Sequence, residues 1–346
     1  MHRKINGLFF GTMIVALLLS ACSSATTMAP TIPPSPAPAM STATTQPADG
    51  NLLPEVDPGT VTGDFIAAGS STVYPLTERM VERFQQEGYA GNPTIDSIGS
   101  GAGFERFCTT GETDISNASR KIKDSEITSC QAIGRTPIEF RIGTDALAIA
   151  IKINNTFLTD VSMEELAQIF TQAVKWSDVN PAWPNEDILR FSPGTDSGTF
   201  DYFVEAVLQP VYAGDNKSAK NAILNATNIQ FSEDDNVLVQ GVEGSPYAIG
   251  YFGYAYFAEN QGQLKAITVN GIMPSFDTAE DGTYPLARPL FLYSDAQVMK
   301  NKPQVAAFLN FFLTYVNEEI GNVGYFPASQ EALDAARQAW LTAMNP

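Results

Sequence analysis

Apolar and polar positions along the chain recur in one unit: a short apolar run, a small hydroxyl-rich loop, then apolar residues at helical spacing. The clearest copy combines the strand-like run 188–191 with the loop 192–199 and a helix bearing Phe200, Phe203 and Val207. A loop that opens a helix exposes unpaired N–H groups at the positive end of the helix dipole, which suits an anion. Ser and Thr are also ordinary helix caps, so one copy alone does not establish a site.

The unit occurs twice more, near the start of the predicted domain. Asp64–Ala68 is typical of a buried strand and leads through the loop Gly69–Pro75 into a helix. Thr94–Ile98 alternates like a strand and leads through Gly99–Gly103 into a second helix. The glycine loop is no P-loop, since no Gly-Lys-Ser/Thr follows it.

An arginine among small polar residues adds a candidate ligand group. Arg120 closes the stretch 113–120, and its guanidinium presents a planar fork that matches a tetrahedral oxyanion. An arginine on a solvated loop is the alternative for this residue alone. Three loops and an arginine together favour a buried oxyanion site, because a buried anion needs several donors.

The remaining pattern predicts an α/β fold with largely parallel sheets, whose ligands bind at the carboxyl ends of the strands. Two long apolar strands, 145–151 and 286–293, could connect two domains in opposite directions. The aromatic stretch 246–256 is interpreted as a buried strand running into a helix, rather than as a stacking platform. Trp176 and Trp183 are likewise interpreted as packing residues.

The first 21 residues have the three parts of a secretory signal: the basic start His2-Arg3-Lys4, an apolar run 8–19 and a small-residue exit. The exit Leu19-Ser20-Ala21-Cys22 resembles the lipobox of bacterial lipoproteins, which implies cleavage before Cys22 and lipidation of its thiol. An ordinary signal with an incidental cysteine is the alternative. Residues 22–59, rich in Ser, Thr, Ala and Pro, are predicted to form a flexible tether.

Charge and residue counts exclude several function classes. The chain carries a net charge of −18, and removal of the signal would leave −20, so nucleic acid is not an expected partner. The only histidine is His2, inside the signal, which removes Ser-His-Asp and Cys-His chemistry and the usual zinc sites. Cys108 and Cys130 are predicted to form a disulfide outside the cytoplasm; two free buried thiols are the alternative.

These stretches resemble the phosphate-binding proteins that serve the high-affinity phosphate ABC importer of bacteria. The matching stretches are Gly69–Pro75, Ile98–Phe104, Asp114–Arg120, Thr195–Phe200 and Ala248–Tyr251, in the family's order. The resemblance implies a type II periplasmic-binding-protein fold with phosphate between two α/β lobes joined by two crossing strands. Lobe I would comprise 60–143 plus 288–346, and lobe II 144–287, with a hinge near Gly143 and Arg288.

The resemblance also implies site residues. Ser71, Thr72 and Val73 match the first phosphate loop, Ser100 the second, Ser119 and Arg120 the third, and Ser197, Gly198 and Thr199 the donors of lobe II. Some family members have an aspartate where this chain has Arg120, and an arginine where it has Pro193. The exchange suggests that the guanidinium has changed lobes, as in the Ser-Arg subgroup.

A carboxylate in the site would accept the proton that phosphate keeps near neutral pH and repel a fully ionised sulfate. Asp196 is the first candidate for this acceptor and Asp114 the second; a capping role is the alternative for Asp196.

The sequence thus predicts an extracytoplasmic, lipid-anchored, monomeric receptor that binds inorganic phosphate and delivers it to a permease. We expect no cofactor and no enzymatic activity. The alternatives are a binding protein for another oxyanion (sulfate, molybdate or a phosphonate), a phosphohydrolase using Ser or Thr, or an adhesion or signalling protein that has lost the ligand.

Overall fold

The computed structural model describes residues 53–345, and the predicted signal and the lipidation site Cys22 lie outside them. In the first part of the chain, the elements are β1 (Ile66–Gly69), α1 (Tyr74–Gln86), β2 (Thr94–Ser97), α2 (Ser100–Glu105), β3 (Ile115–Ala118), α3 (Asp124–Ala132) and β4 (Ile138–Lys152). The predicted strand–loop–helix units therefore form as expected, and Pro75 sits in the first turn of α1.

The middle of the chain contains most of the short elements. They are β5 (Asp160–Val161), α4 (Met163–Phe170), α5 (Trp176–Val179), β6 (Leu189–Pro193), α6 (Gly198–Phe203), α7 (Asn216–Leu224), β7 (Ile229–Ser232), α8 (Asp235–Glu243), β8 (Ala248–Gly253), α9 (Tyr254–Glu259), β9 (Leu264–Ala266), β10 (Thr268–Val269) and α10 (Phe276–Glu280). The chain ends with β11 (Ala287–Ser294), α11 (Ala296–Asn301), α12 (Pro303–Glu319), β12 (Phe326–Pro327) and α13 (Gln330–Met344).

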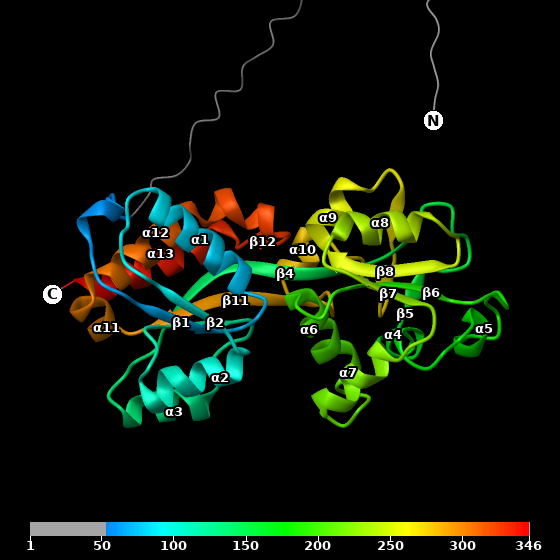
Figure 1. Cartoon of the computed structure of the whole chain (residues 1–346), viewed down its shortest axis with the longest axis horizontal. Coiled ribbons are helices and arrows are strands. Elements are labelled where there is room, and N and C mark those ends of the chain that lie inside the picture. Colours follow the sequence, from blue (N-terminus) through cyan, green and yellow to red (C-terminus); the bar gives the residue numbers. More distant parts are fainter. Residues whose placement is uncertain (1–52, 346) are drawn as a thin grey trace, which may run out of the picture. The chain divides into compact units, whose positions relative to one another are not determined.

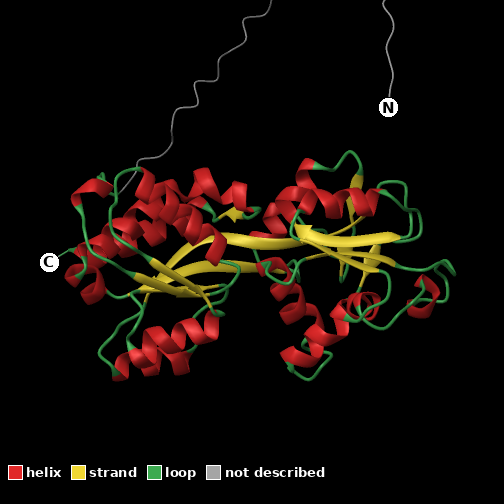
Figure 2. Ribbon diagram, viewed as in Figure 1, coloured by secondary structure: helices red, strands yellow, loops and turns green. Residues whose placement is uncertain are grey.

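Ten of the strands form a mixed sheet in the order β2-β1-β3-β11-β4-β8-β6-β7, with β9 and β12 paired to β4 outside this path, and β5 pairs with β10 in a separate two-stranded sheet. Pairs within β2-β1-β3 and within β8-β6-β7 are parallel, whereas β11 and β4 run antiparallel to their neighbours on this path. Figure 1 shows β4 and β11 running lengthwise between the two groups of strands, and Figure 2 shows helices on both sides of them. The two long apolar strands therefore do cross in opposite directions.

Two large hydrophobic cores lie at opposite ends of these crossing strands. One core takes its residues from 53–142 and 290–343, and the other from 147–286. We call 53–143 together with 288–345 the first half, and 144–287 the second half. Trp176 is fully buried in the second core with Trp183 against it, so both tryptophans pack as expected.

The predicted tether extends too far toward the domain. Leu53 is 5% exposed in the first core, and the Asn310 side-chain amide donates to the Pro54 carbonyl at 3.0 Å. Asp57 caps a short 3-10 helix at Pro58–Thr60. Residues 53–59 therefore belong to the folded domain, because the apolar side chains of Leu53 and Val56 find a place in the first core.

The predicted disulfide is present: Cys108 and Cys130 are bonded and buried. It joins the π-helical turn Arg106–Thr110, which continues α2, to α3. A crosslink closing a loop of this size contributes about 3 kcal/mol. Within residues 53–345, no helix is long and apolar enough to span a membrane.

Candidate anion-binding site

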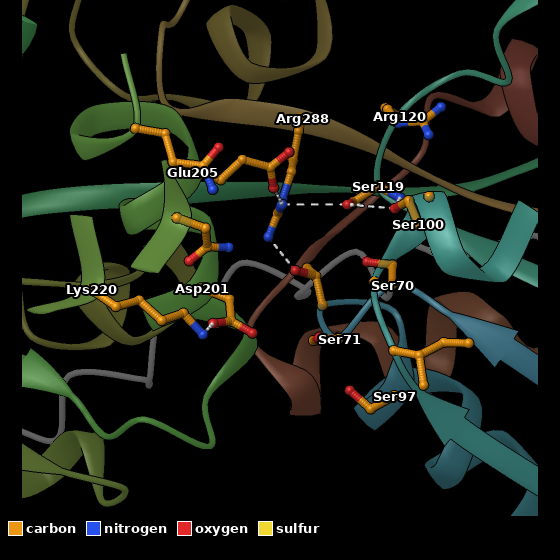
Figure 3. A pocket seen from close by; sticks show the side chains of 16 residues that line it. Ser70, Ser71, Ser97, Ser100, Ser119, Arg120, Asp201, Glu205, Lys220 and Arg288 are labelled. Atoms are coloured by element: carbon orange, nitrogen blue, oxygen red, sulfur yellow. Dashed lines mark hydrogen bonds and ion pairs between the residues drawn. The ribbon is translucent and has the colours of Figure 1, made fainter. Parts of the chain in front are cut away.

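A cavity of about 470 Å³ lies between the two halves, where the loops after β1, β2 and β3 face α6, α7 and β11. Figure 3 shows serine side chains of the first half on one side of it and Asp201, Glu205 and Lys220 of the second half on the other. Its lining residues are Ser70, Ser71, Thr72, Ser97, Ile98, Gly99, Ser100, Gly101, Ser119, Arg120, Asp201, Glu205, Gln209, Asn216, Lys220 and Arg288.

The first loop reaches the cavity because β1 ends on a glycine. Gly69 has φ +145°, and a Cβ there would collide with the carbonyl oxygen of Asn117 on the neighbouring strand. The chain then turns so that Ser71 and Thr72 line the cavity. Val73, the third predicted residue of this loop, is buried outside the lining, and its N–H donates to Ser70 Oγ at 3.4 Å.

The second and third loops are joined by their serines. Ser100 Oγ accepts from the Ser119 N–H at 3.1 Å and lies 3.3 Å from Ser119 Oγ. The glycine loop is itself tied to the first loop, because the N–H groups of Ile98 and Gly99 both donate to the Gly69 carbonyl. The three predicted first-half loops therefore converge on one place.

Arg288 on β11 is the arginine in contact with these hydroxyls. Its Nη1 donates to Ser119 Oγ at 3.3 Å, and its Nη2 donates to Thr72 Oγ1. Its Nε donates to Asp145 Oδ2 at 3.2 Å. The guanidinium carbon stacks on the Tyr202 ring, 3.6 Å from the ring centroid. The side chain is 9% exposed, so its charge acts in a partly water-excluded place where charge-assisted bonds are strong.

Asp145 is the buried ion-pair partner of this arginine. It is fully buried on β4, and burial raises the pKa of its carboxyl group, which the adjacent Arg288 partly offsets. Its Oδ1 has no hydrogen-bond partner among the described residues. The carboxylate therefore directs Arg288 Nε without consuming the two terminal nitrogens.

Arg120 also lines the cavity, but its terminal nitrogens are occupied. They donate to the two carboxylate oxygens of Glu126 at 2.9 and 2.6 Å, and the guanidinium lies over the Phe104 ring. Burial alone would raise the pKa of Glu126, but hydrogen bonds from Arg120 and from the Lys123 N–H hold it below its ordinary value. Arg120 is thus one side of a bidentate ion pair in this structure.

The predicted second-half loop lies beside the cavity without lining it. Ser197 Oγ caps α6 by accepting from the Thr199 N–H at 3.2 Å. The Gly198 carbonyl accepts from Arg288 Nη2 at 3.4 Å, and a Cβ on Gly198 would lie 2.8 Å from the Ser71 carbonyl oxygen. The two halves therefore touch here, backbone against backbone.

Neither predicted proton acceptor faces the cavity. Asp196 is exposed and outside the lining, and its N–H donates to Glu233 Oε1 at 3.4 Å. Asp114 is buried elsewhere, accepting from the Ile66 N–H and from Lys302 Nζ. Two carboxylates do line the cavity, those of Asp201 and Glu205. Asp201 Oδ1 lies 2.6 Å from Lys220 Nζ, and Glu205 Oε2 lies 3.4 Å from Arg288 Nη1.

Sequence reasoning thus missed Arg288 and Glu205 as site residues. A signal for Arg288 was present, because a charged residue inside the apolar strand 286–293 requires a buried partner. Asp145 in the other apolar strand was the matching sign. For Glu205, the signal was the polar row Asp201, Glu205 and Gln209 at four-residue spacing along an otherwise apolar helix.

The donor set suits an oxyanion rather than a metal. Among residues 53–345, no cluster of three or more His, Cys, Asp or Glu side chains could hold a metal ion. The first-half lining supplies hydroxyls, amides and guanidinium groups, and both lining carboxylates come from the second half.

Comparison with known proteins agrees with this chemistry. A family model described as a PBP superfamily domain matches residues 41–315. Protein SphX of Synechococcus elongatus is 41% identical over 283 residues, covering 79% of this chain and 80% of the relative. Phosphate-binding protein PstS of Staphylococcus saprophyticus is 34% identical, covering 78% of this chain and 82% of the relative.

A solved structure extends the likeness to the fold. The possible phosphate-binding protein of Planctomyces limnophilus superposes with a TM-score of 0.72 at 34% identity, covering 82% of this chain and all of that one. The mixed sheet with two crossing strands agrees with the predicted fold class. The chain therefore belongs to the phosphate-binding protein family and has its type II periplasmic-binding-protein fold.

Proposed function

We propose that this protein is the extracytoplasmic receptor of a phosphate ABC importer, binding inorganic phosphate in the cavity described above and performing no chemistry on it. The observation that carries the proposal is the partly water-excluded cluster of Arg288 with the hydroxyls of Thr72 and Ser119. The name of one relative, phosphate-binding protein PstS, supports the same ion.

Phosphate would bind by replacing the bonds that these groups make to one another. Arg288 Nη1 and Nη2 form a fork toward Ser119 and Thr72, and an oxyanion between them would accept from both nitrogens and both hydroxyls. Ser71 and Ser100 add hydroxyls to the same wall. Arg120 would act mainly through its charge, because Glu126 occupies its terminal nitrogens.

The second half would complete the site by closure. We propose that the halves move as lobe I (60–143 plus 288–346) and lobe II (144–287), hinged near Gly143 and Arg288. The separate cores of the two halves support rigid-body motion. Closure would bring Ser197, Gly198 and Thr199 from the edge of the cavity onto the ion. We also propose that the chain belongs to the Ser-Arg subgroup of the family.

We assign discrimination against sulfate to Glu205 in place of Asp196. Hydrogen phosphate can donate a hydrogen bond to this carboxylate, whereas fully ionised sulfate is repelled by it. Glu205→Gln should therefore narrow the preference for phosphate over sulfate, and Asp196→Asn should leave it unchanged. An unchanged preference in Glu205→Gln would remove Glu205 from this role.

Calorimetry on protein freed of bound ligand tests the function. We expect phosphate to bind with a Kd in the micromolar range or tighter, and no binding would refute the proposal. Competition by sulfate, molybdate and a phosphonate tests the other oxyanions. A chromogenic phosphate ester tests phosphohydrolase activity, which we expect to be absent.

We further propose that a lipid on Cys22 anchors the protein at the outer face of the membrane, as a monomer beside its permease. Mass spectrometry of the mature N-terminus should find the lipid, and Cys22→Ser should release the protein from the membrane fraction. Retention of the unmodified variant in that fraction would contradict the anchor.

A further inference from the structure

The two crossing strands have a second face, on the side away from the anion cavity. Arg288 points into that cavity, while its neighbours Ala287 and Pro289 point to the opposite side, as successive residues of a strand do. A second cavity of about 560 Å³ lies there, between the strands, the end of α10 and the helix α13. Figure 1 shows α10 above β4, with α2 and α6 beneath it.

Glu280, at the end of α10, bridges the two halves on this rear face. Its Oε2 accepts from Arg141 Nη2 at 2.9 Å and from Thr144 Oγ1 at 2.5 Å. Its Oε1 accepts from the N–H of Ser329, the cap of α13, at 3.0 Å. A second-half carboxylate is therefore bound to the first-half residues Arg141 and Ser329, and to Thr144 on the hinge strand.

The charges of this bridge depend on one another. The Arg141 side chain is 15% exposed, and Glu280 is the partner of its ion pair. Its Nη1 has no hydrogen-bond partner among the described residues. Burial alone would raise the pKa of Glu280, but the bonds from Thr144, Ser329 and Arg141 hold it below its ordinary value. The carboxylate is thus ionised and well satisfied in this arrangement.

The anion cavity is too large for one tetrahedral oxyanion. At about 30 Å³ for each water in the liquid, its volume of about 470 Å³ would hold on the order of fifteen waters. Closure onto an ion therefore has to narrow the front of the hinge. Rotation about the crossing strands that narrows the front separates the elements behind them, where Glu280 joins α10 to α13.

We propose that Glu280 is a latch across the rear of the hinge, which opens as the cleft closes and so weakens the binding of the ion. This inference rests on the proposed function, since it concerns closure of the same cleft. The cavity beside the latch already separates α10 from α13 there, so these helices can move further apart without breaking a packed core. The latch keeps the receptor open until an ion is bound, which also favours release of the ion at the permease.

The consequence for affinity follows from population shift. The apparent Kd equals the intrinsic Kd divided by the fraction of molecules able to close. Weakening a contact made only in the open form raises that fraction, so latch variants bind the ion more tightly although they do not touch it. We expect a decrease in Kd of about fivefold.

The experiment compares three variants by calorimetry with phosphate and by small-angle X-ray scattering with and without phosphate. Glu280→Gln removes the charge and keeps the shape, and Thr144→Val keeps the volume but removes both hydrogen bonds of the hydroxyl, the one donated to Glu280 and the one accepted from Arg141. Asp281→Asn is the matched control, because this neighbouring carboxylate bonds to Thr283 within the second half. Both latch variants should bind phosphate more tightly and have a smaller radius of gyration without ligand, and the control should match the wild type.

Wild-type or weaker affinity in both latch variants would overturn the proposal; weaker binding would mean that the contacts belong to the closed form. If the wild type does not bind phosphate at all, the proposed function fails. The latch is then judged by scattering alone, where an unchanged radius of gyration in both variants overturns it.

Discussion

The loops of the first half and the loop of the second half are built alike but are placed differently. Each follows a parallel strand and opens a helix: Gly69–Val73 before α1, Gly99 before α2, and Gly194–Ser197 before α6. The first two line the anion cavity, whereas the third lies at its edge. A shared local motif therefore does not give a shared position at the cavity.

Hydrogen bonding explains part of the difference between the loops of the two halves. In the first half, Ser100 and Ser119 bond to each other across two loops, which fixes both hydroxyls at the cavity wall. In the second half, Ser197 Oγ bonds within its own helix start. Under the proposed closure, the first half would therefore present preorganised hydroxyls, and the second half would have to rearrange.

Charge explains the rest. The second-half loop lies beside an acidic segment, Glu233-Asp234-Asp235, and a Cβ on Gly194 would collide with the Glu233 carboxylate. The first-half loops contribute no carboxylate to the cavity. The two walls of the cavity therefore differ in charge. The first-half wall carries Arg120 and Arg288 and no carboxylate, whereas the second-half wall carries Asp201 and Glu205 beside Lys220, which favours initial contact of an anion with the first half.

The largest expected effect comes from the arginine that meets the first-half loops. Arg288→Lys keeps the charge next to Asp145 but loses the fork toward Thr72 and Ser119, so phosphate affinity should fall by about 100-fold. Arg120→Lys is the matched control, because Arg120 is bound to Glu126. The Kd of this variant for phosphate should differ from that of the wild type by less than about threefold. Calorimetry measures both, and equal losses would place the two arginines on the ion together.

Gly198→Ala tests the contact between the halves. The added Cβ would lie 2.8 Å from both the Ser71 carbonyl oxygen and Thr72 Cα, and backbone atoms cannot yield as a side chain can. We expect a loss of phosphate affinity of about 20-fold, because a separation of the halves costs on the order of 2 kcal/mol of closure. Gly262→Ala, at a position with open space around it, is the control. Normal affinity in Gly198→Ala would show that closure does not need this contact.

Ser100→Ala and Ser197→Ala separate the preorganised half from the rearranging one. Ser100→Ala should weaken phosphate binding about tenfold, since a hydroxyl bonded to an anion is lost, while scattering still shows contraction with ligand. Ser197→Ala should weaken binding about fivefold and reduce that contraction, because its contact forms only on closure. Its stability should also fall by about 1 kcal/mol through the lost helix cap. Full contraction in Ser197→Ala would contradict this division between the halves.

The smallest effect concerns the acidic segment of the second half. Burial, together with Asp234 and Glu233, raises the pKa of Asp235 to about 6. A carboxyl group whose pKa is higher in the folded state favours folding at low pH, and this stability is lost as pH rises through about 6. Asp235→Asn should therefore raise the free energy of unfolding by about 1 kcal/mol at pH 8, with partial exposure taken into account, and by much less at pH 4.5. Urea denaturation at the two pH values measures the difference, and an equal gain at both would assign it to another cause.

Much of the fold was predictable from local pattern. The apolar periodicity correctly predicts α1, α12 and the long strands β4 and β11, because these elements bury one face or both. The pairing of Cys108 with Cys130 follows from their number and compartment. The tether was predicted to end too late because Leu53 and Val56 are isolated apolar residues without a periodic pattern, and only the groove beside α12 buries them.

The candidate site was only half predictable. By itself, the sequence determined the hydroxyl loops of the first half, since a strand, a small-residue loop and a helix start are local features. The sequence did not determine which arginine contacts the hydroxyls of these loops. Arg288 and Asp145 are far apart along the chain and become neighbours only because β11 and β4 pair antiparallel in one register. Glu205 reaches Arg288 only because the second half packs across those strands. Strand register and the placement of the halves are properties of the whole fold, so the tertiary structure alone decided which charges face the cavity.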